Sequence, residues 1–421
     1  MKYSPRTAFG KSKEFTGSLI MVKYQGLCQG NGAAPAGWCV ISIVILNCHK
    51  SKGHGSQFLA PISKVKKDLA AILFVDDNDL IHLDMSKEET CWEAFNAMQD
   101  SVESWGKLLI ATGGTLKPIK CFSYLMSFDW DEKGKWSYAK HEEDEGAVIM
   151  VPMPGGEEKP IKNLGCDVVK ETLGICTSPE GLGKASIDKM REKADKWIRS
   201  AAGARLHRKM FWTSVETQFW PSVSYGLCCS MATLEELEGS LQKRYHKMAP
   251  KGGLIRSAKR EIRQLSSGFY GAGLPHPGVE TAVAQCNKLL MHYGCQSSTG
   301  VQLQVSMELL LCELGISFQP LQEDYQKYEK WVTRSWLKTV WEKAHKFGLE
   351  ITLGNIPLKF AREGDKWMMR AFMEAGYNDT ELERLNRVRV HQQVLFLSDV
   401  LCAGGRYLEQ RYLNQRPLDE N

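Results

Sequence analysis

The chain has 421 residues, of which 43% are hydrophobic and 10% aromatic, and its formal net charge is +5. A sequence of this length and apolar content can bury a sizeable core, which excludes a disordered protein and favours two or three domains. Its 13 cysteines are odd in number and form no C-x-x-C pair, so we expect reduced thiols inside the cell. The apolar run 40–47 is too short for a membrane span, and no signal-peptide pattern is seen. We therefore expect an intracellular protein with no membrane partner, in the nucleus or the cytoplasm.

A loop rich in glycine, alanine and proline covers residues 29–38 and leads into an apolar run that ends at Asn47. Its small residues would let another backbone or a flat ligand approach closely. Further along, His49 and His54 flank a loop of lysine and glycine. We expect these histidines to be solvated or to face a phosphate rather than to bind a metal.

Two adjacent aspartates, Asp76 and Asp77, end the apolar run 70–75. A returning run at 80–83 predicts a β-hairpin around them. Adjacent carboxylates repel each other and are unfavourable in strands, so they are either exposed in a solvated turn or neutralised by a cation. Mg²⁺ prefers hard oxygen ligands, usually one or two carboxylates plus substrate phosphates. Asp76 and Asp77 are therefore candidate Mg²⁺ ligands, and an ordinary solvated turn is the alternative.

The next elements are predicted from spacing and turn residues. Ser86 and Glu89 form a capping box. Apolar residues three or four apart from Trp92 to Leu109 predict a helix that ends at Gly113-Gly114. Short strands are predicted at 121–128, 135–138, 148–152 and 168–175.

The pattern changes to helices beyond residue 183. Amphipathic spacing predicts helices within 187–198 and 234–248. The Gly/Pro-rich segment 266–277 is a candidate boundary, and the rest of the chain is helical by pattern. Its tryptophans at 331, 336 and 341 could stack on bases, but helical spacing favours core packing.

Basic residues outnumber acidic ones between Lys184 and Arg263. Such a region is either a footprint for a phosphate backbone or an ordinary charged surface. Both interpretations stay open at this point.

Four motifs follow one another along the chain: Gln29-Gly30-x-x-x-Ala34-Pro35, Phe74-Val75-Asp76-Asp77, Gly113-Gly114-Thr-Leu-Lys117-Pro-Ile-Lys120-Cys, and Thr172-Leu173-Gly174-Ile175. Each is weak alone. In this order and spacing they resemble the reverse transcriptases, or RNA-directed DNA polymerases, of non-long-terminal-repeat retroelements (retrotransposons). The resemblance covers roughly residues 5–270.

The resemblance implies a nucleotidyltransferase site. Gln29, Gly30 and Pro35 would lie against the incoming deoxynucleoside triphosphate and the template, where a glycine leaves room for a base pair. Asp76 and Asp77 would bind Mg²⁺, with Asp76 the more important ligand. The partners would be an RNA template and a DNA primer.

Further roles follow from the same resemblance. Lys120 would protonate the departing pyrophosphate, a reasonable task for an ammonium near phosphates, although it is equally interpreted as a solvated charge beside a strand. Leu173-Gly174 resembles the turn that grips the primer. The basic helices after Gly183 would form a thumb that tracks a hybrid duplex by shape and backbone charge.

The sequence departs from the family at one point. The family has a further metal-binding aspartate on a strand before the Gln29-Gly30 loop, and no aspartate precedes Asp68 here. We therefore expect an amino-terminally truncated fragment with little or no activity of its own.

The expected fold class is α+β. Residues 1–182 would form a partial polymerase palm of antiparallel sheet plus helices, 183–270 a helical thumb, and 271–421 a mostly helical domain of unknown role. Three functions compete: a reverse-transcriptase fragment, a non-catalytic nucleic-acid-binding remnant of a retroelement, and a helical scaffold with an incidental Asp-Asp turn.

Overall fold

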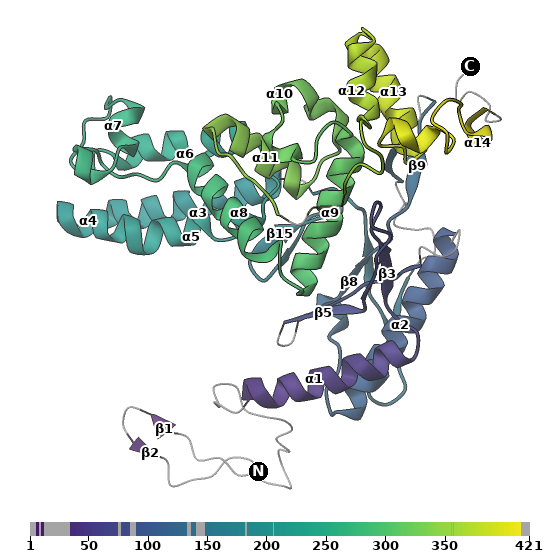
Figure 1. The fold of residues 1–421 in the computed structure, drawn as a ribbon. Coiled ribbons are helices and arrows are strands. Elements are labelled where there is room, and N and C mark those ends of the chain that lie inside the picture. The colour runs from purple at the N-terminus through teal and green to yellow at the C-terminus, as the bar shows by residue number, and fades with distance from the viewer. Residues whose placement is uncertain are drawn as a thin grey trace. The chain divides into compact units, whose positions relative to one another are not determined.

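The computed structural model describes a chain of helices and small sheets, so the fold class is α+β (Figure 1). The described residues are 6–7, 10–11, 34–74, 77–84, 90–132, 136–139, 148–181, 183–204, 206–354, 356 and 358–413. No helix among them combines the length and the apolar character that a membrane span requires.

The chain divides into two compact units. Unit 1 comprises residues 1–58 and 68–165, and unit 2 comprises residues 59–67 and 166–421. The predicted division at residues 182 and 270 stays a prediction.

Unit 1 combines two long helices with short strands. Its elements, together with β3 and β4 that run across its edge, are β1 (Arg6–Thr7), β2 (Gly10–Lys11), α1 (Ala34–Ser51), β3 (Ser56–Leu59), β4 (Lys66–Leu69), β5 (Ala71–Phe74), β6 (Asp77–Leu80), β7 (Leu83–Asp84), α2 (Cys91–Ala111), the 3-10 helix η1 (Pro118–Lys120), β8 (Phe122–Tyr124), β9 (Phe128–Trp130), β10 (Trp136–Tyr138), β11 (Met150–Pro152), β12 (Glu158–Pro160) and β13 (Lys162–Leu164). Strands β5–β6, β9–β10 and β11–β12 pair as antiparallel hairpins, whereas β8–β13 and β3–β7 are parallel pairs.

Helix α2 forms the centre of unit 1. It begins at Cys91, and Thr90 and Glu93 form a capping box at its start. The capping box predicted at 86–89 lies outside the described residues. Gly113 follows the helix with a φ of 86°, which confirms the predicted end. One apolar side of α2 packs on α1 through Ile45, Trp105 and Leu109.

Unit 2 is mostly helical, as predicted. It contains β14 (Lys170–Thr172), β15 (Ile175–Thr177), α3 (Lys184–Gly203), α4 (Arg208–Ser214), the π-helix η2 (Val215–Phe219), α5 (Trp220–Ser224), η3 (Leu227–Cys229), α6 (Leu234–Met248), α7 (Arg260–Gln264), η4 (Ser267–Phe269), α8 (Pro277–His292), α9 (Ser298–Leu314), η5 (Pro320–Gln322), α10 (Tyr325–Tyr328), η6 (Glu329–Trp331), α11 (Trp336–Phe347), α12 (Met368–Glu374), α13 (Asp379–His391), η7 (Leu397–Val400) and α14 (Gln410–Leu413). The predicted helices within 187–198 and 234–248 are α3 and α6, which lie side by side (Figure 1).

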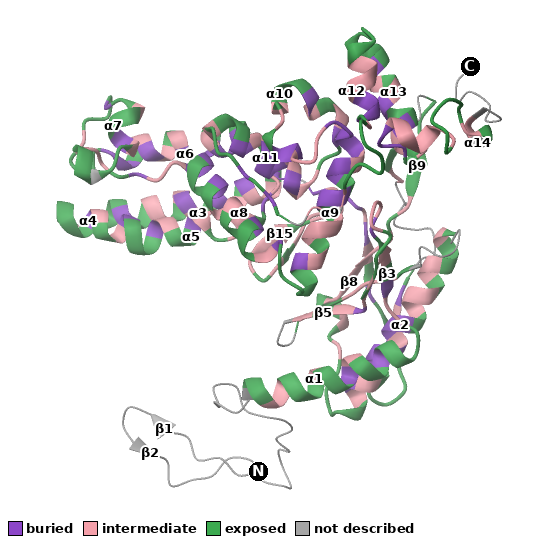
Figure 2. Cartoon of the chain, in the orientation of Figure 1, coloured by how far each residue is buried: buried purple, intermediate pink, exposed green. Residues whose placement is uncertain are grey.

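Two large apolar clusters hold unit 2 together. The first joins α3 to α6 around Phe219 and Leu241, and the second joins α8 to α13 around Leu311 and Trp341. Buried positions recur along α9 and α11 in the second cluster (Figure 2). Trp341 is fully buried, which confirms the expected core role for this tryptophan.

Candidate functional site

Asp77 of the Asp76-Asp77 motif begins the second strand of an antiparallel hairpin. Strand β5 pairs with β6 so that Ala71 faces Leu80 and Phe74 faces Asp77. The returning strand thus begins at Asp77 itself, earlier than the run 80–83 that the sequence predicts. Asp76 lies outside the described residues.

The two faces of the hairpin differ because side chains alternate along a strand, and the face with Asp77 and Asp79 also carries Ile72, which pairs with Asp79. Leu73 and Leu80 are half-buried and pack against the α1–α2 cluster. Asp77 and Asp79 are exposed on the other face. The hairpin is therefore attached by one face and presents two carboxylates on the other.

The environment of Asp79 disfavours its charged form. Partial desolvation raises the pKa of Asp79, and the negative charge of Asp77 raises it further. A divalent cation would relieve this repulsion, and carboxylate oxygens are the hard ligands that Mg²⁺ prefers. Within the described residues no group of three metal-ligating side chains is found.

Sequence reasoning missed Asp79. A signal was present, because Asp77-Asn78-Asp79 alternates at the period of a strand and so places both aspartates on one face. The motif Asp76-Asp77 consists of adjacent residues, whereas the residues that share one face of a strand are two apart.

The other predicted site residues are not joined to this pair. Gln29 and Gly30 lie outside the described residues, and Pro35 is exposed in the first turn of α1. Lys120 is the exposed last residue of η1. Among the described residues, no hydrogen bond or ion pair links Lys120 to Asp77.

The expectation that His49 is solvated is wrong. His49 is fully buried near the end of α1. Its ring centroid is 4.7 Å from that of His54 and 5.2 Å from that of Trp105, and the Trp105 and His49 rings are nearly perpendicular. Its Nε2 atom is 3.2 Å from Ser101 Oγ. Burial, with smaller effects of His54 and Lys52, lowers the pKa of His49 to about 4, so the ring is neutral at physiological pH.

A second hairpin has the predicted Leu173-Gly174 at its turn. Leu173 and Gly174 have φ angles of 52° and 82°, the two positive values of a type I′ turn between β14 and β15. Tyr225 donates a hydrogen bond of 2.9 Å to the Leu173 carbonyl, and Lys189 Nζ donates one of 2.7 Å to the Gly174 carbonyl. The turn is thus fixed to α3 and to the residue after α5.

The segment after this turn is basic. Between Lys184 and Arg263 there are 17 lysines and arginines and 8 aspartates and glutamates. Lys196 and Arg199 on α3 are exposed. An excess of this size can attract a polyanion.

Hairpin β9–β10 of unit 1 carries four aromatic side chains on one face. Trp136 faces Trp130 and Tyr138 faces Phe128 in the strand register. Trp130 is 67% exposed. Exposed aromatic rings can stack on the bases of single strands.

Comparison with known proteins gives no family. No protein-family model matches the sequence, and no curated protein matches it. The resemblance to reverse transcriptases therefore stays a prediction.

Proposed function

We propose that this chain is part of a reverse transcriptase that adds deoxynucleotides to a primer on an RNA template. The observation that carries the proposal is the hairpin β5–β6, with an aromatic-x-Asp-Asp motif at its turn. One face packs on α1 and α2, and the other presents Asp77 and Asp79. Phosphoryl transfer needs carboxylates that are held in place and accessible to a substrate.

Each residue then has a defined task. Asp76 and Asp77 would hold Mg²⁺, and Asp79 on the same face as Asp77 would add negative charge beside it. Bound Mg²⁺ supplies a lowered pKa for the attacking hydroxyl and charge stabilisation for the leaving oxygen. Leu73 and Leu80 keep the strands in register on the apolar cluster.

The remaining motifs fit the same activity. Gln29, Gly30 and Pro35 would orient the incoming nucleotide and the template, and Lys120 would give a proton to pyrophosphate. The fixed turn at Leu173-Gly174 would contact the primer strand. The basic helices after it would follow the RNA–DNA hybrid along its phosphates.

The test combines metal binding with primer extension. The family has one more aspartate before the Gln29-Gly30 loop, and residues 1–67 contain none. Because we expect little turnover from this chain, metal binding is measured separately from primer extension. Mn²⁺ serves as the paramagnetic probe for the Mg²⁺ site. We expect Asp77→Asn and Asp76→Ala each to weaken Mn²⁺ binding at least about tenfold, since each removes a charged ligand.

Asp129→Asn is the matched control, because Asp129 is also an exposed aspartate on a hairpin strand. It should leave Mn²⁺ binding unchanged. Unchanged binding in the Asp76→Asn, Asp77→Asn double variant would refute the metal site. Extension that survives Asp76→Ala would do the same.

A second candidate function is nucleic-acid binding without chemistry. The excess of basic residues at 184–263 and the aromatic face of β9–β10 favour it. Binding to an RNA–DNA hybrid should weaken with salt, with a slope of log K against log salt of about −0.9 for each phosphate contacted. Lys196→Glu with Arg199→Glu should weaken binding and reduce this slope. No hybrid binding at low salt would exclude this function.

A further inference from the structure

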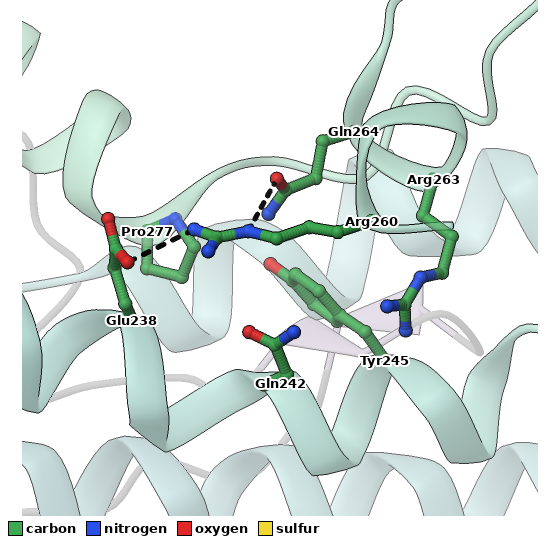
Figure 3. A pocket seen from close by; sticks show the side chains of 7 residues that line it. All are labelled: Glu238, Gln242, Tyr245, Arg260, Arg263, Gln264 and Pro277. Atoms are coloured by element: carbon green, nitrogen blue, oxygen red, sulfur yellow. Dashed lines mark hydrogen bonds and ion pairs between the residues drawn. The ribbon is translucent and has the colours of Figure 1, made fainter. Parts of the chain in front are cut away.

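A charged pocket in unit 2 has no part in the proposed chemistry. Helix α6 contributes Glu238, Gln242 and Tyr245 from one face, and α7 contributes Arg260 and Arg263 (Figure 3). The spacing of 238, 242 and 245 places these three side chains on one side of the helix.

The first arginine of the pocket is neutralised within the protein. Arg260 Nη2 lies 3.2 Å from a Glu238 carboxylate oxygen, and Arg260 Nε donates to Gln264 Oε1 at 3.2 Å. His276 Nε2 is 3.4 Å from the other Glu238 oxygen. The carboxylate that lines the pocket is therefore already paired with Arg260.

The second arginine is not neutralised by a residue of the pocket. Arg263 is only 4% exposed, and within the part of the chain that the structure describes its buried Nε and Nη1 atoms have no hydrogen-bond partner. A buried charge that lacks a partner is costly, because the desolvation of the guanidinium is not offset. The pocket is thus lined by an arginine whose positive charge has no hydrogen-bonded carboxylate among the described residues.

The size of the cavity limits what can enter it. Its volume is about 10 Å³, close to the space that one water-sized atom needs. A large organic ligand does not fit, whereas one oxygen of a tetrahedral anion can enter from the open side. Gln242 lines the same space and can donate from its side-chain amide.

We propose that Arg263 and Gln242 bind an oxygen of a phosphate group. Guanidinium and phosphate form strong charge-assisted hydrogen bonds, and the binding would neutralise the charge of Arg263. The surrounding segment 184–263 is strongly basic, which favours an anion with more than one charge over a monocarboxylate. The phosphate is either free or part of a polynucleotide, and the proposal does not depend on polymerase activity.

The test measures the thermal stability of the full chain with inorganic phosphate. Phosphate is added up to about 10 mM against sodium chloride at equal ionic strength, a range in which general salting effects are small. If the concentration reaches about ten times Kd, the Tm of the wild type should rise by roughly 3–5 °C. Arg263→Met should abolish this rise.

Two further variants keep the test decisive if Arg263→Met fails to fold. Gln242→Leu leaves Arg263 in place and should reduce the phosphate-dependent rise by more than half. Arg256→Gln removes an exposed arginine near the pocket residues in sequence and should leave the rise unchanged. A wild-type Tm that responds equally to phosphate and chloride would overturn the proposal, as would an unchanged rise in Gln242→Leu.

A second arm identifies the source of the phosphate. A short single-stranded oligonucleotide without terminal phosphate is titrated onto the wild type and onto Gln242→Leu. If the variant binds it several-fold more weakly and inorganic phosphate competes, the site takes a backbone phosphate. If only inorganic phosphate responds to the substitution, the site takes the free anion, and in both cases the phosphate assignment stands.

Discussion

Acid should destabilise unit 1 through His49. This ring is buried, and its pKa is lowered from 6.5 to about 4, chiefly by burial. Above pH 6.5 the ring is neutral in both the folded and the unfolded state. Between pH 6.5 and pH 4 the unfolded chain takes up the proton and the folded chain does not, so the free energy of unfolding falls. One pKa unit corresponds to about 1.4 kcal/mol, so the full loss is at most about 3 kcal/mol at pH 4.

Urea unfolding between pH 7.5 and pH 4.5, followed by tryptophan fluorescence, measures this loss. Because carboxylates also titrate in this range, the informative quantity is the difference between wild type and His49→Phe. Phenylalanine retains a ring beside Trp105 but takes up no proton. Its lost contact with Ser101 Oγ lowers stability at every pH, so the slopes are compared rather than the absolute values. We expect the wild type to lose about 2–3 kcal/mol more than the variant over this range.

The control is His391→Gln, which removes an exposed histidine at the end of α13. It should keep the wild-type slope. Equal slopes for wild type and His49→Phe would refute the reasoning. So would an NMR titration in which the ring protons of His49 respond near pH 6.5.

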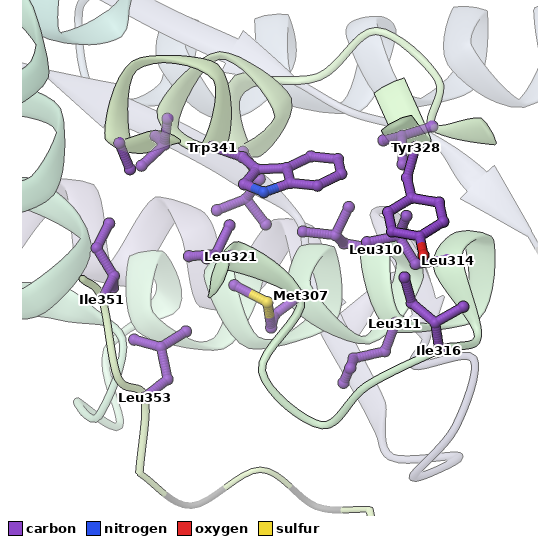
Figure 4. Close-up of a cluster of buried hydrophobic side chains, with 14 of the residues drawn as sticks. Met307, Leu310, Leu311, Leu314, Ile316, Leu321, Tyr328, Trp341, Ile351 and Leu353 are labelled. Atoms are coloured by element: carbon purple, nitrogen blue, oxygen red, sulfur yellow. The ribbon is translucent and has the colours of Figure 1, made fainter. Parts of the chain in front are cut away.

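Two further predictions concern packing. Gly239 lies inside α6 with no atom within 4 Å of an added Cβ, so Gly239→Ala should raise the free energy of unfolding by about 0.5–1 kcal/mol in urea titration. Gly174 has a φ of 82°, and a Cβ added there would lie 2.8 Å from the Tyr225 ring, so Gly174→Ala should lower the free energy of unfolding. The same sign for both variants would contradict the structure. Trp341 is fully buried in the second cluster of unit 2 (Figure 4), so Trp341→Ala should lower the free energy of unfolding by about 3–5 kcal/mol in the same assay. Trp130→Ala truncates an exposed ring and should lower it by less than about 1 kcal/mol.

Some local patterns predicted local structure, although the predicted loop at 29–38 is helical from Ala34 onward. The helix at 234–248 was predicted from apolar spacing, and α6 has the same bounds because its apolar stripe packs on α3. The turn at Leu173-Gly174 was expected only from the family resemblance; it interrupts the strand predicted at 168–175, and a positive φ explains the glycine. The hairpin around Asp76-Asp77 was predicted from an apolar run followed by turn residues. In each case the signal lies within about fifteen residues of chain.

Properties that depend on distant residues were not predicted. His49 was expected to be solvated because lysine and glycine follow it, but Ser101 and Trp105 on α2 bury it. Arg260 pairs with Glu238 of α6, whereas buried atoms of Arg263 have no hydrogen-bond partner among the described residues. No spacing in the sequence reports which of two nearby arginines takes the carboxylate.

The acid response of His49 also bears on the proposed metal site. Leu73 and Leu80 of the hairpin pack on the same apolar cluster as Trp105, whose edge contacts His49. Metal binding should therefore weaken at low pH for two reasons: protonation of a carboxylate removes ligand charge, and the support beneath the hairpin loosens. The variant His49→Phe removes only the second cause, so the part of the pH dependence that it abolishes measures how far the carboxylate face relies on the helical core.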